Sequence, residues 1–122
     1  MNWYIIAQYH DDIKQLEHSL EAKYPGLDLE LWESNNGWIE LAVIELPKDM
    51  RNFGYGTEIV NAVKAYAAQK GLPVILHPNS EKGKKEALEK FYRNLGFVFN
   101  RGRNTDFQLS HPFSPTMYWK PQ

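Results

Sequence analysis

A glycine turn between an apolar segment and an amphipathic segment constrains the fold of this chain more than any other feature. The turn reads Arg-Asn-Phe-Gly-Tyr-Gly over residues 51–56, after the apolar run 41–47. A turn of this kind at the start of a helix gathers backbone N–H groups at the positive end of the helix dipole. Gly54 and Gly56 let the backbone approach a ligand with no Cβ in the way, and Arg51 can add a charge-assisted hydrogen bond. The pattern favours a site for a pyrophosphate.

Two common nucleotide motifs do not match this turn. The dinucleotide-binding pattern Gly-x-Gly-x-x-Gly requires a glycine at position 59, where the chain has Ile59. No Gly-Lys-Ser/Thr follows to make a P-loop. The remaining alternative is a purely structural helix N-terminus, in which Gly54 serves only the tight turn.

Strand and helix patterns follow the turn. Residues 57–70 carry apolar side chains at helical spacing and stop at Gly71, and residues 72–77 form a short apolar strand of the kind buried on both faces. A second helix follows a polar loop at 78–85 and ends at Gly96. Its predicted apolar face consists of Ala87, Leu88, Phe91, Tyr92 and Leu95.

The N-terminal part predicts a strand, a helix and a second strand. The aromatic and β-branched run 3–7 predicts the first strand. Asp12 and Gln15 have the spacing of a capping box, which predicts a helix that ends at Pro25-Gly26. Residues 27–32 alternate between apolar and polar, as a half-buried strand should.

A hairpin and two C-terminal strands complete the expected order. The Asn35-Asn-Gly37 turn returns the chain into a strand over residues 38–46. Residues 97–99 and 117–119 predict the last two strands. The expected order is therefore β-α-β-β-α-β-α-β-β.

Composition limits the chain to one domain and excludes several classes of function. Its 122 residues, 43% hydrophobic and 24% charged, suit one domain over residues 1–122. A net charge of −1 gives no basic field for nucleic acid or an anionic membrane. The absence of cysteine excludes thiolate metal sites, and the four histidines lack metal-ligand spacing. With no membrane-spanning run or signal-peptide pattern, we expect a cytoplasmic protein without a metal, a nucleic-acid partner or a membrane partner.

Two motifs, taken together, indicate a family. The turn at residues 51–56 and the helix ending Phe91-Tyr-Arg-Asn-Leu-Gly-Phe97, in this order, resemble the GNAT superfamily of acyl-CoA-dependent N-acetyltransferases. The resemblance covers roughly residues 38–107 and is to a small stand-alone member. It implies an α/β (α+β) reduced GNAT fold with a mixed, mostly antiparallel central sheet flanked by helices. A parallel strand pair would splay at the CoA cleft, with a bulge near Pro47.

The resemblance also implies how acetyl-CoA would bind as co-substrate. The pantetheine arm would add to the sheet edge as a strand does, along the backbone of Ile44, Glu45 and Leu46. Phe91 and Tyr92 would contact the cofactor from the second helix. The pyrophosphate would lie on Arg51, Asn52, Phe53, Gly54, Tyr55, Gly56 and Thr57.

Candidate catalytic residues follow from the same resemblance. Tyr92 matches a tyrosine that often protonates the departing CoA sulfur, and its alternative role is packing on the helix face. Glu40 is a candidate general base, or it points outward into solvent. Glu45 is the competing carboxylate, on the opposite face by strand parity unless a bulge intervenes. A water chain without a direct base is a further alternative.

Two polar clusters keep alternative roles. Residues 100–107 could shape an acceptor pocket or form a solvated turn. The second cluster consists of Lys82, Lys84 and Lys85. The favoured interpretation is a solvated loop, and the minority interpretation is that these lysines reach the CoA 3′-phosphate.

The function implied is an N-acetyltransferase that moves an acetyl group from acetyl-CoA to a primary amine by direct attack. The acceptor, a small molecule or a protein, stays open. The alternative is a catalytically silent GNAT-fold module that binds CoA or a partner protein. We also expect that an exposed sheet edge allows a homodimer, and that a phage-encoded protein of this kind acts in the host cytoplasm.

Overall fold

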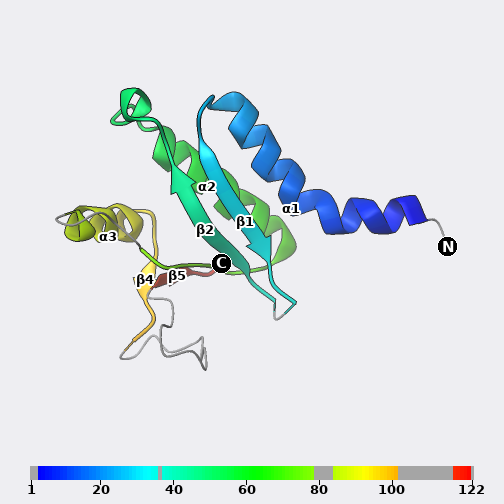
Figure 1. The fold of residues 1–122 in the computed structure, drawn as a ribbon. Helices are drawn as coiled ribbons and strands as arrows, with labels where there is room; N and C mark the ends of the chain where they lie inside the picture. Colours follow the sequence, from blue (N-terminus) through cyan, green and yellow to red (C-terminus); the bar gives the residue numbers. More distant parts are fainter. Residues whose placement is uncertain (1–2, 36, 79–83, 102–116, 122) are drawn as a thin grey trace.

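Five strands form one mixed sheet, in the order β1-β2-β3-β5-β4 (Figure 1). The computed structural model describes residues 3–35, 37–78, 84–101 and 117–121. The elements are α1 (Trp3–Lys23), β1 (Asp28–Glu33), β2 (Ile39–Glu45), the 3-10 turn η1 (Lys48–Met50), α2 (Tyr55–Lys70), β3 (Val74–Leu76), α3 (Lys85–Asn94), β4 (Val98–Phe99) and β5 (Met117–Trp119).

The strand pairing confirms the mixed, mostly antiparallel sheet. β1 pairs antiparallel with β2, β2 pairs parallel with β3, and β5 pairs antiparallel with both β3 and β4. A parallel pair needs a crossover connection, and α2 supplies it between β2 and β3. Among the described strands, β1 and β4 are the sheet edges, and the homodimer stays a prediction.

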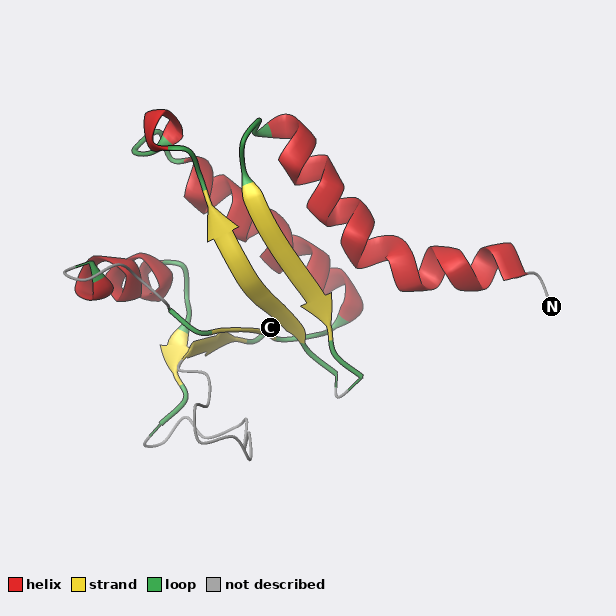
Figure 2. Cartoon of the chain, viewed as in Figure 1, coloured by secondary structure: helices red, strands yellow, loops and turns green. Residues whose placement is uncertain are grey.

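The core lies between the sheet and the helices α1 and α2. α2 lies on one face of β1 and β2, and α1 runs alongside β1 (Figure 2), where Lys14 and Glu17 form hydrogen bonds with the backbone of Leu31. Leu31 and Ile39 are fully buried on that face, and all three residues of β3 are buried, as its apolar run predicted. The predicted stripe of α2 supplies the opposing surface, with Tyr66 partly buried and the rest buried: Ile59, Val60, Val63 and Ala67.

The prediction of a strand over residues 3–7 is wrong, because α1 is continuous from Trp3 to Lys23. A short apolar run has no periodicity that separates a strand from a helix, and no glycine or proline interrupts residues 3–24. The predicted helix start at Asp12 is therefore wrong as well, since that residue lies inside α1. The predicted end at Pro25-Gly26 is confirmed, and Gly26 has a φ of 90°. The observed order is α-β-β-α-β-α-β-β.

The predicted hairpin is confirmed. The N–H of Ser34 donates to the carbonyl of Trp38 at 2.8 Å, and Gly37 has a φ of 91°, the left-handed region that glycine favours. The predicted C-terminal strands are present as β4 and β5. Most of the predicted polar stretch 100–107 lies outside the described residues. No helix in the described part of the chain is long and apolar enough to cross a membrane.

Candidate functional site

The site begins where β2 separates from β3. The two strands pair over only three residues, Ile39 to Leu41 against Val74 to Leu76. At the same point β2 is bulged, because Leu31 pairs with Leu41 whereas Glu30 pairs with Val43, which leaves Ala42 as the extra residue. Beyond the bulge, no strand among the described residues pairs with the side of β2 that faces β3.

The bulge lies several residues before the predicted position. The expected position is near Pro47, but β2 ends at Glu45 and Pro47 is the N-cap residue of η1. The fixed φ of proline suits the start of such a turn, so Pro47 ends the strand without bulging it. The bulge also changes the parity of β2, so that Glu45 lies on the same face as Glu40.

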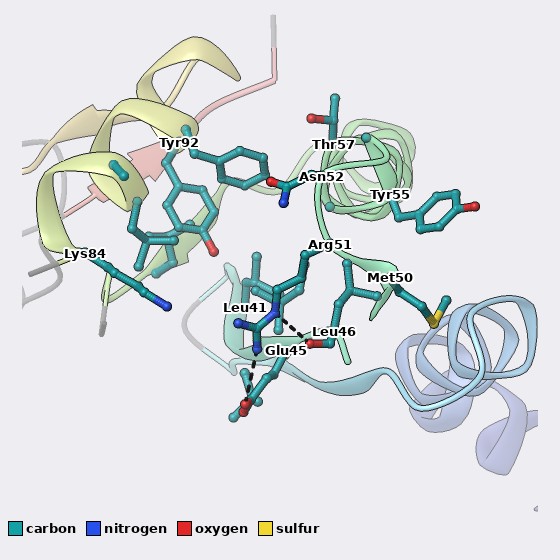
Figure 3. A pocket seen from close by; sticks show the side chains of 18 of the residues that line it. Leu41, Glu45, Leu46, Met50, Arg51, Asn52, Tyr55, Thr57, Lys84 and Tyr92 are labelled. Atoms are coloured by element: carbon teal, nitrogen blue, oxygen red, sulfur yellow. Dashed lines mark hydrogen bonds and ion pairs between the residues drawn. The ribbon is translucent and has the colours of Figure 1, made fainter. Parts of the chain in front are cut away.

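A cleft of about 1030 Å³ opens where β2 and β3 separate. It is lined by residues 41–46, which form the end of β2 and the residue after it, by the turn before α2, by Leu76 and His77, and by one face of α3 (Figure 3). All but one of the predicted cofactor-binding residues line it, and the exception is Phe53, which is 66% exposed. Segments far apart in the sequence thus meet around one opening.

The start of α2 faces this cleft with unsatisfied donors. Gly54 precedes the helix with a left-handed φ of 81°, and no side chain caps this end. The first helical bond runs from the N–H of Glu58 to the carbonyl of Gly54 at 3.2 Å, so the N–H groups of residues 55–57 have no acceptor inside the helix. Asn52 also has a positive φ, 69°. The turn therefore directs backbone donors to the cleft, as an anion site requires.

The two glycines of the turn differ in backbone conformation and in the space around them. A Cβ at Gly54 would meet nothing within 4 Å, so the left-handed backbone alone favours glycine there. A Cβ at Gly56 would lie 3.4 Å from Cζ of Phe91. This is an ordinary van der Waals contact, so the space at Gly56 does not by itself require glycine.

Arg51 connects the turn to the end of β2. Its Nε donates to the carbonyl of Leu46 at 3.0 Å, and its Nη2 lies 3.9 Å from Oε1 of Glu45 (Figure 3). The guanidinium is 37% exposed and the carboxylate 67%, so the ion pair itself is weak. The stronger effect of Arg51 is to fix the turn against the strand end through the hydrogen bond to Leu46.

Tyr92 is buried, but its hydroxyl points into the cleft (Figure 3). The ring packs edge-on against Phe91 and Phe97, with centroids 5.1 and 5.6 Å apart. Among the residues that the structure describes, none forms a hydrogen bond with this hydroxyl. Burial raises the pKa of the Tyr92 phenol to about 12, so it stays protonated at neutral pH. The phenol is thus a neutral hydrogen-bond donor at the edge of the cleft.

Glu40 lies next to the cleft but does not line it. It is half-buried on β2, opposite Trp32 in the strand register, while its neighbour Leu41 lines the cleft. The other candidate carboxylate, Glu45, lines the cleft directly. The general-base role of Glu40 stays a prediction.

Sequence reasoning missed a contact that fixes the first turn of α2. The hydroxyl of Tyr24 donates to Oε2 of Glu58 at 2.6 Å, and the ring of Tyr24 lies 5.4 Å from that of Tyr55. The hydrogen bond to Glu58, followed by burial, raises the pKa of the Tyr24 phenol to about 12. The contact joins residues 34 positions apart, and no local sequence pattern predicts it. Lys84, one of the three lysines noted above, also lines the cleft.

Comparison with known proteins identifies the family. Residues 22–97 match the model of the acetyltransferase (GNAT) family, which is more than half of the chain, and the chain therefore belongs to this family. No curated protein matches the sequence.

Solved structures share the fold at low identity. The anti-CRISPR protein AcrVA5 is 20% identical with a TM-score of 0.58, over 78% of this chain and 90% of that one. Ard1 from Thermoplasma volcanium is 15% identical with a TM-score of 0.57, over 89% and 80%. Arabidopsis thaliana Naa50, solved with the bisubstrate analogue CoA-Ac-MVNAL, is 18% identical with a TM-score of 0.50, over 75% of this chain and 61% of that one. These likenesses show the GNAT fold.

Proposed function

We propose that the protein transfers an acetyl group from acetyl-CoA to a primary amine by direct attack. One observation carries the proposal: the unpaired side of β2, the free N–H groups at the start of α2 and the Tyr92 hydroxyl all border one cleft. Membership of the GNAT acetyltransferase family supports it, as does the fold shared with Naa50, which was solved with a CoA-containing bisubstrate analogue.

In this proposal the donor binds through backbone groups. The pantetheine arm lies along residues 44–46, at the end of β2, on the side towards β3 that has no strand partner among the described residues. The pyrophosphate lies at the start of α2, where residues 55–57 have N–H groups without helical acceptors and Gly54 adds no side chain. Arg51 holds the turn in place through Leu46, and Lys84 supplies a positive charge at the cleft.

The proposed reaction consists of attack by the amine and departure of the CoA sulfur. The neutral amine attacks the thioester carbonyl, the C–N bond forms, and backbone donors of β2 hold the developing oxyanion. The C–S bond breaks as Tyr92 gives its proton to the departing sulfur, and the phenol regains a proton from solvent. The proton lost by the amine leaves through Glu40 by way of water, because Glu40 does not line the cleft itself, or through Glu45.

Titration calorimetry with acetyl-CoA tests the donor site. We expect wild type to bind acetyl-CoA and Gly54→Glu to lose binding, because the new carboxylate would stand where the pyrophosphate binds. Gly71→Glu is the matched control: Gly71 ends the same helix with a φ of 69° and also has open space around it. It adds the same charge and similar backbone strain at the far end of α2, so its affinity should equal that of wild type.

The outcomes separate enzyme from binding module. Absence of binding by wild type, or equal loss in both variants, would overturn the proposed donor site. Binding without turnover across a screen of amines would leave the catalytically silent module as the function.

A further inference from the structure

The outward face of the β1–β2 hairpin is unusually acidic. The strand register places it opposite α2, which covers the other face, while α1 runs alongside the edge of β1. The face consists of Asp28, Glu30, Trp32, Glu40, Val43 and Glu45. Four of these six residues are acidic although the net charge of the whole chain is only −1, so the charge is concentrated here.

Among the described residues, Glu45 is the only one of these four acidic groups that forms an ion pair. Asp28 and Glu45 are directly opposite in the antiparallel register, an arrangement that destabilises a sheet. Among the described residues, no ion pair reaches Asp28, Glu30 or Glu40, and Glu45 has only the 3.9 Å contact with Arg51. The face therefore attracts cations from outside the fold.

An exposed aromatic ring lies at the far end of this face. Trp32 is 50% exposed, which is uncommon for so large an apolar side chain. The ammonium group of Lys14 lies 3.7 Å from the centroid of its ring. The indole thus already accepts one cation, and its remaining surface suits the stem of an arginine or lysine.

The acidic face is continuous with the cleft. Val43 and Glu45 belong to both, since they also line the cleft. From Asp28 to Trp32 the strand rises roughly 13 Å, which is more than an amine with a single ammonium group can span. An extended polypeptide with several basic residues can cover this distance while one lysine reaches the cleft.

We propose that the outward face of the β1–β2 hairpin docks a basic segment of an acceptor protein and presents one of its lysines to the cleft. This inference rests on the proposed acetyl transfer and deepens it, because it names the acceptor as a polypeptide. Asp28, Glu30 and Glu40 attract the basic side chains, Trp32 packs on one of their stems, and Glu45 lies at the entrance to the cleft.

The test measures binding of a labelled peptide by fluorescence anisotropy at low salt. The probe has a blocked N-terminus and one central lysine flanked by arginines, and the comparison peptide has glutamine in place of each arginine. The test variant is Asp28→Asn with Glu30→Gln. Its matched control, Glu21→Gln with Glu86→Gln, makes the same charge change on α1 and α3.

We expect the test variant to weaken binding of the basic peptide about tenfold, and the control variant to weaken it by less than about twofold. The glutamine peptide should bind wild type weakly and respond to neither variant. Equal weakening by both variants would show general charge attraction only, and would overturn the proposal. So would absence of peptide binding by wild type, or displacement of the peptide by equimolar spermidine, which would indicate a small polyamine.

Acetyl-CoA titration of the same variants separates this inference from the proposed function. Neither Asp28 nor Glu30 lines the cleft, so both double variants should bind acetyl-CoA as wild type does. Peptide binding that fails while acetyl-CoA still binds would refute the docking face alone. Acetyl-CoA binding that fails while the peptide binds normally would refute the donor site alone.

Discussion

Tyr92→Phe separates the catalytic role of this residue from its packing role. The ring is 4% exposed and packs edge-on against Phe91 and Phe97, and phenylalanine keeps both contacts. The hydroxyl points into the cleft and has no hydrogen-bond partner in the described part of the chain, so its removal leaves no buried group unsatisfied. We expect the free energy of unfolding to change by less than about 0.5 kcal/mol. Tyr92→Ala, which also removes the ring, should cost about 3–5 kcal/mol.

The effect of Tyr92→Phe on the rate should be much larger than its effect on stability. Loss of a general acid typically lowers a rate by roughly 10²–10⁴-fold, and acetyl-CoA affinity should change little. The assay follows release of the CoA thiol, which a protein without cysteine does not obscure. Tyr66→Phe is the matched control, because Tyr66 lies on α2 outside the cleft, and it should keep the wild-type rate.

The pH profile provides an independent check of the same reasoning. A general acid acts while protonated, and the pKa of Tyr92 is raised to about 12, so Tyr92 should cause no fall in rate between pH 7 and 10. A wild-type alkaline fall near pH 9 that disappears in Tyr92→Phe would refute the buried, neutral phenol. A full wild-type rate in Tyr92→Phe would refute the acid role.

Three other perturbations test the structure around the cleft. Tyr24→Phe should lower the free energy of unfolding at pH 8 by about 1–2 kcal/mol, because the hydrogen bond to Glu58 is lost. The pKa of Tyr24 is raised from 10.0 to about 12, so this hydrogen bond contributes its full stability below pH 10 and loses it as the pH rises to 12. The denaturant midpoints of wild type and variant should therefore converge between pH 10 and 12. Arg51→Gln should weaken acetyl-CoA binding in calorimetry, because the bond from Arg51 to the carbonyl of Leu46 fixes the turn; unchanged affinity would contradict this role. Leu31→Ala, at a fully buried position, should cost about 2–5 kcal/mol in urea unfolding, and a cost below about 1 kcal/mol would contradict its place in the core.

Elements with a regular pattern could be predicted from the sequence, and elements set by distant contacts could not. The alternation at residues 27–32, the turn at 35–37 and the apolar stripe of α2 depend on near neighbours, and the structure confirms them. Residues 3–7 were predicted wrongly because a short apolar run suits a strand and a helix equally. The bond from Tyr24 to Glu58 could not be predicted, because it depends on how α1 packs against α2.

The candidate site shows the same division. Its glycine turn and its tyrosine have local signatures, and both border the cleft as the motifs indicated. The contacts of Arg51 with Leu46 and Glu45 depend on where β2 ends, which the motif does not specify. The motif thus indicated residues that line one cleft, whereas the strand end determined what Arg51 contacts.

The bulge at Ala42 connects the two surfaces described above. Without it, strict alternation from Ile39 would turn Val43 and Glu45 towards the core and Ile44 outward. The extra residue reverses this parity, so that Ile44 packs against the core while Glu45 joins Glu40 on the outward face. It lies immediately after the last pair that joins β2 to β3, the point at which the cleft opens. The bulge at Ala42 therefore coincides with the opening of the cleft and places the carboxylate of Glu45 at the cleft entrance. The acidic face and the cleft thus meet at this one bulge.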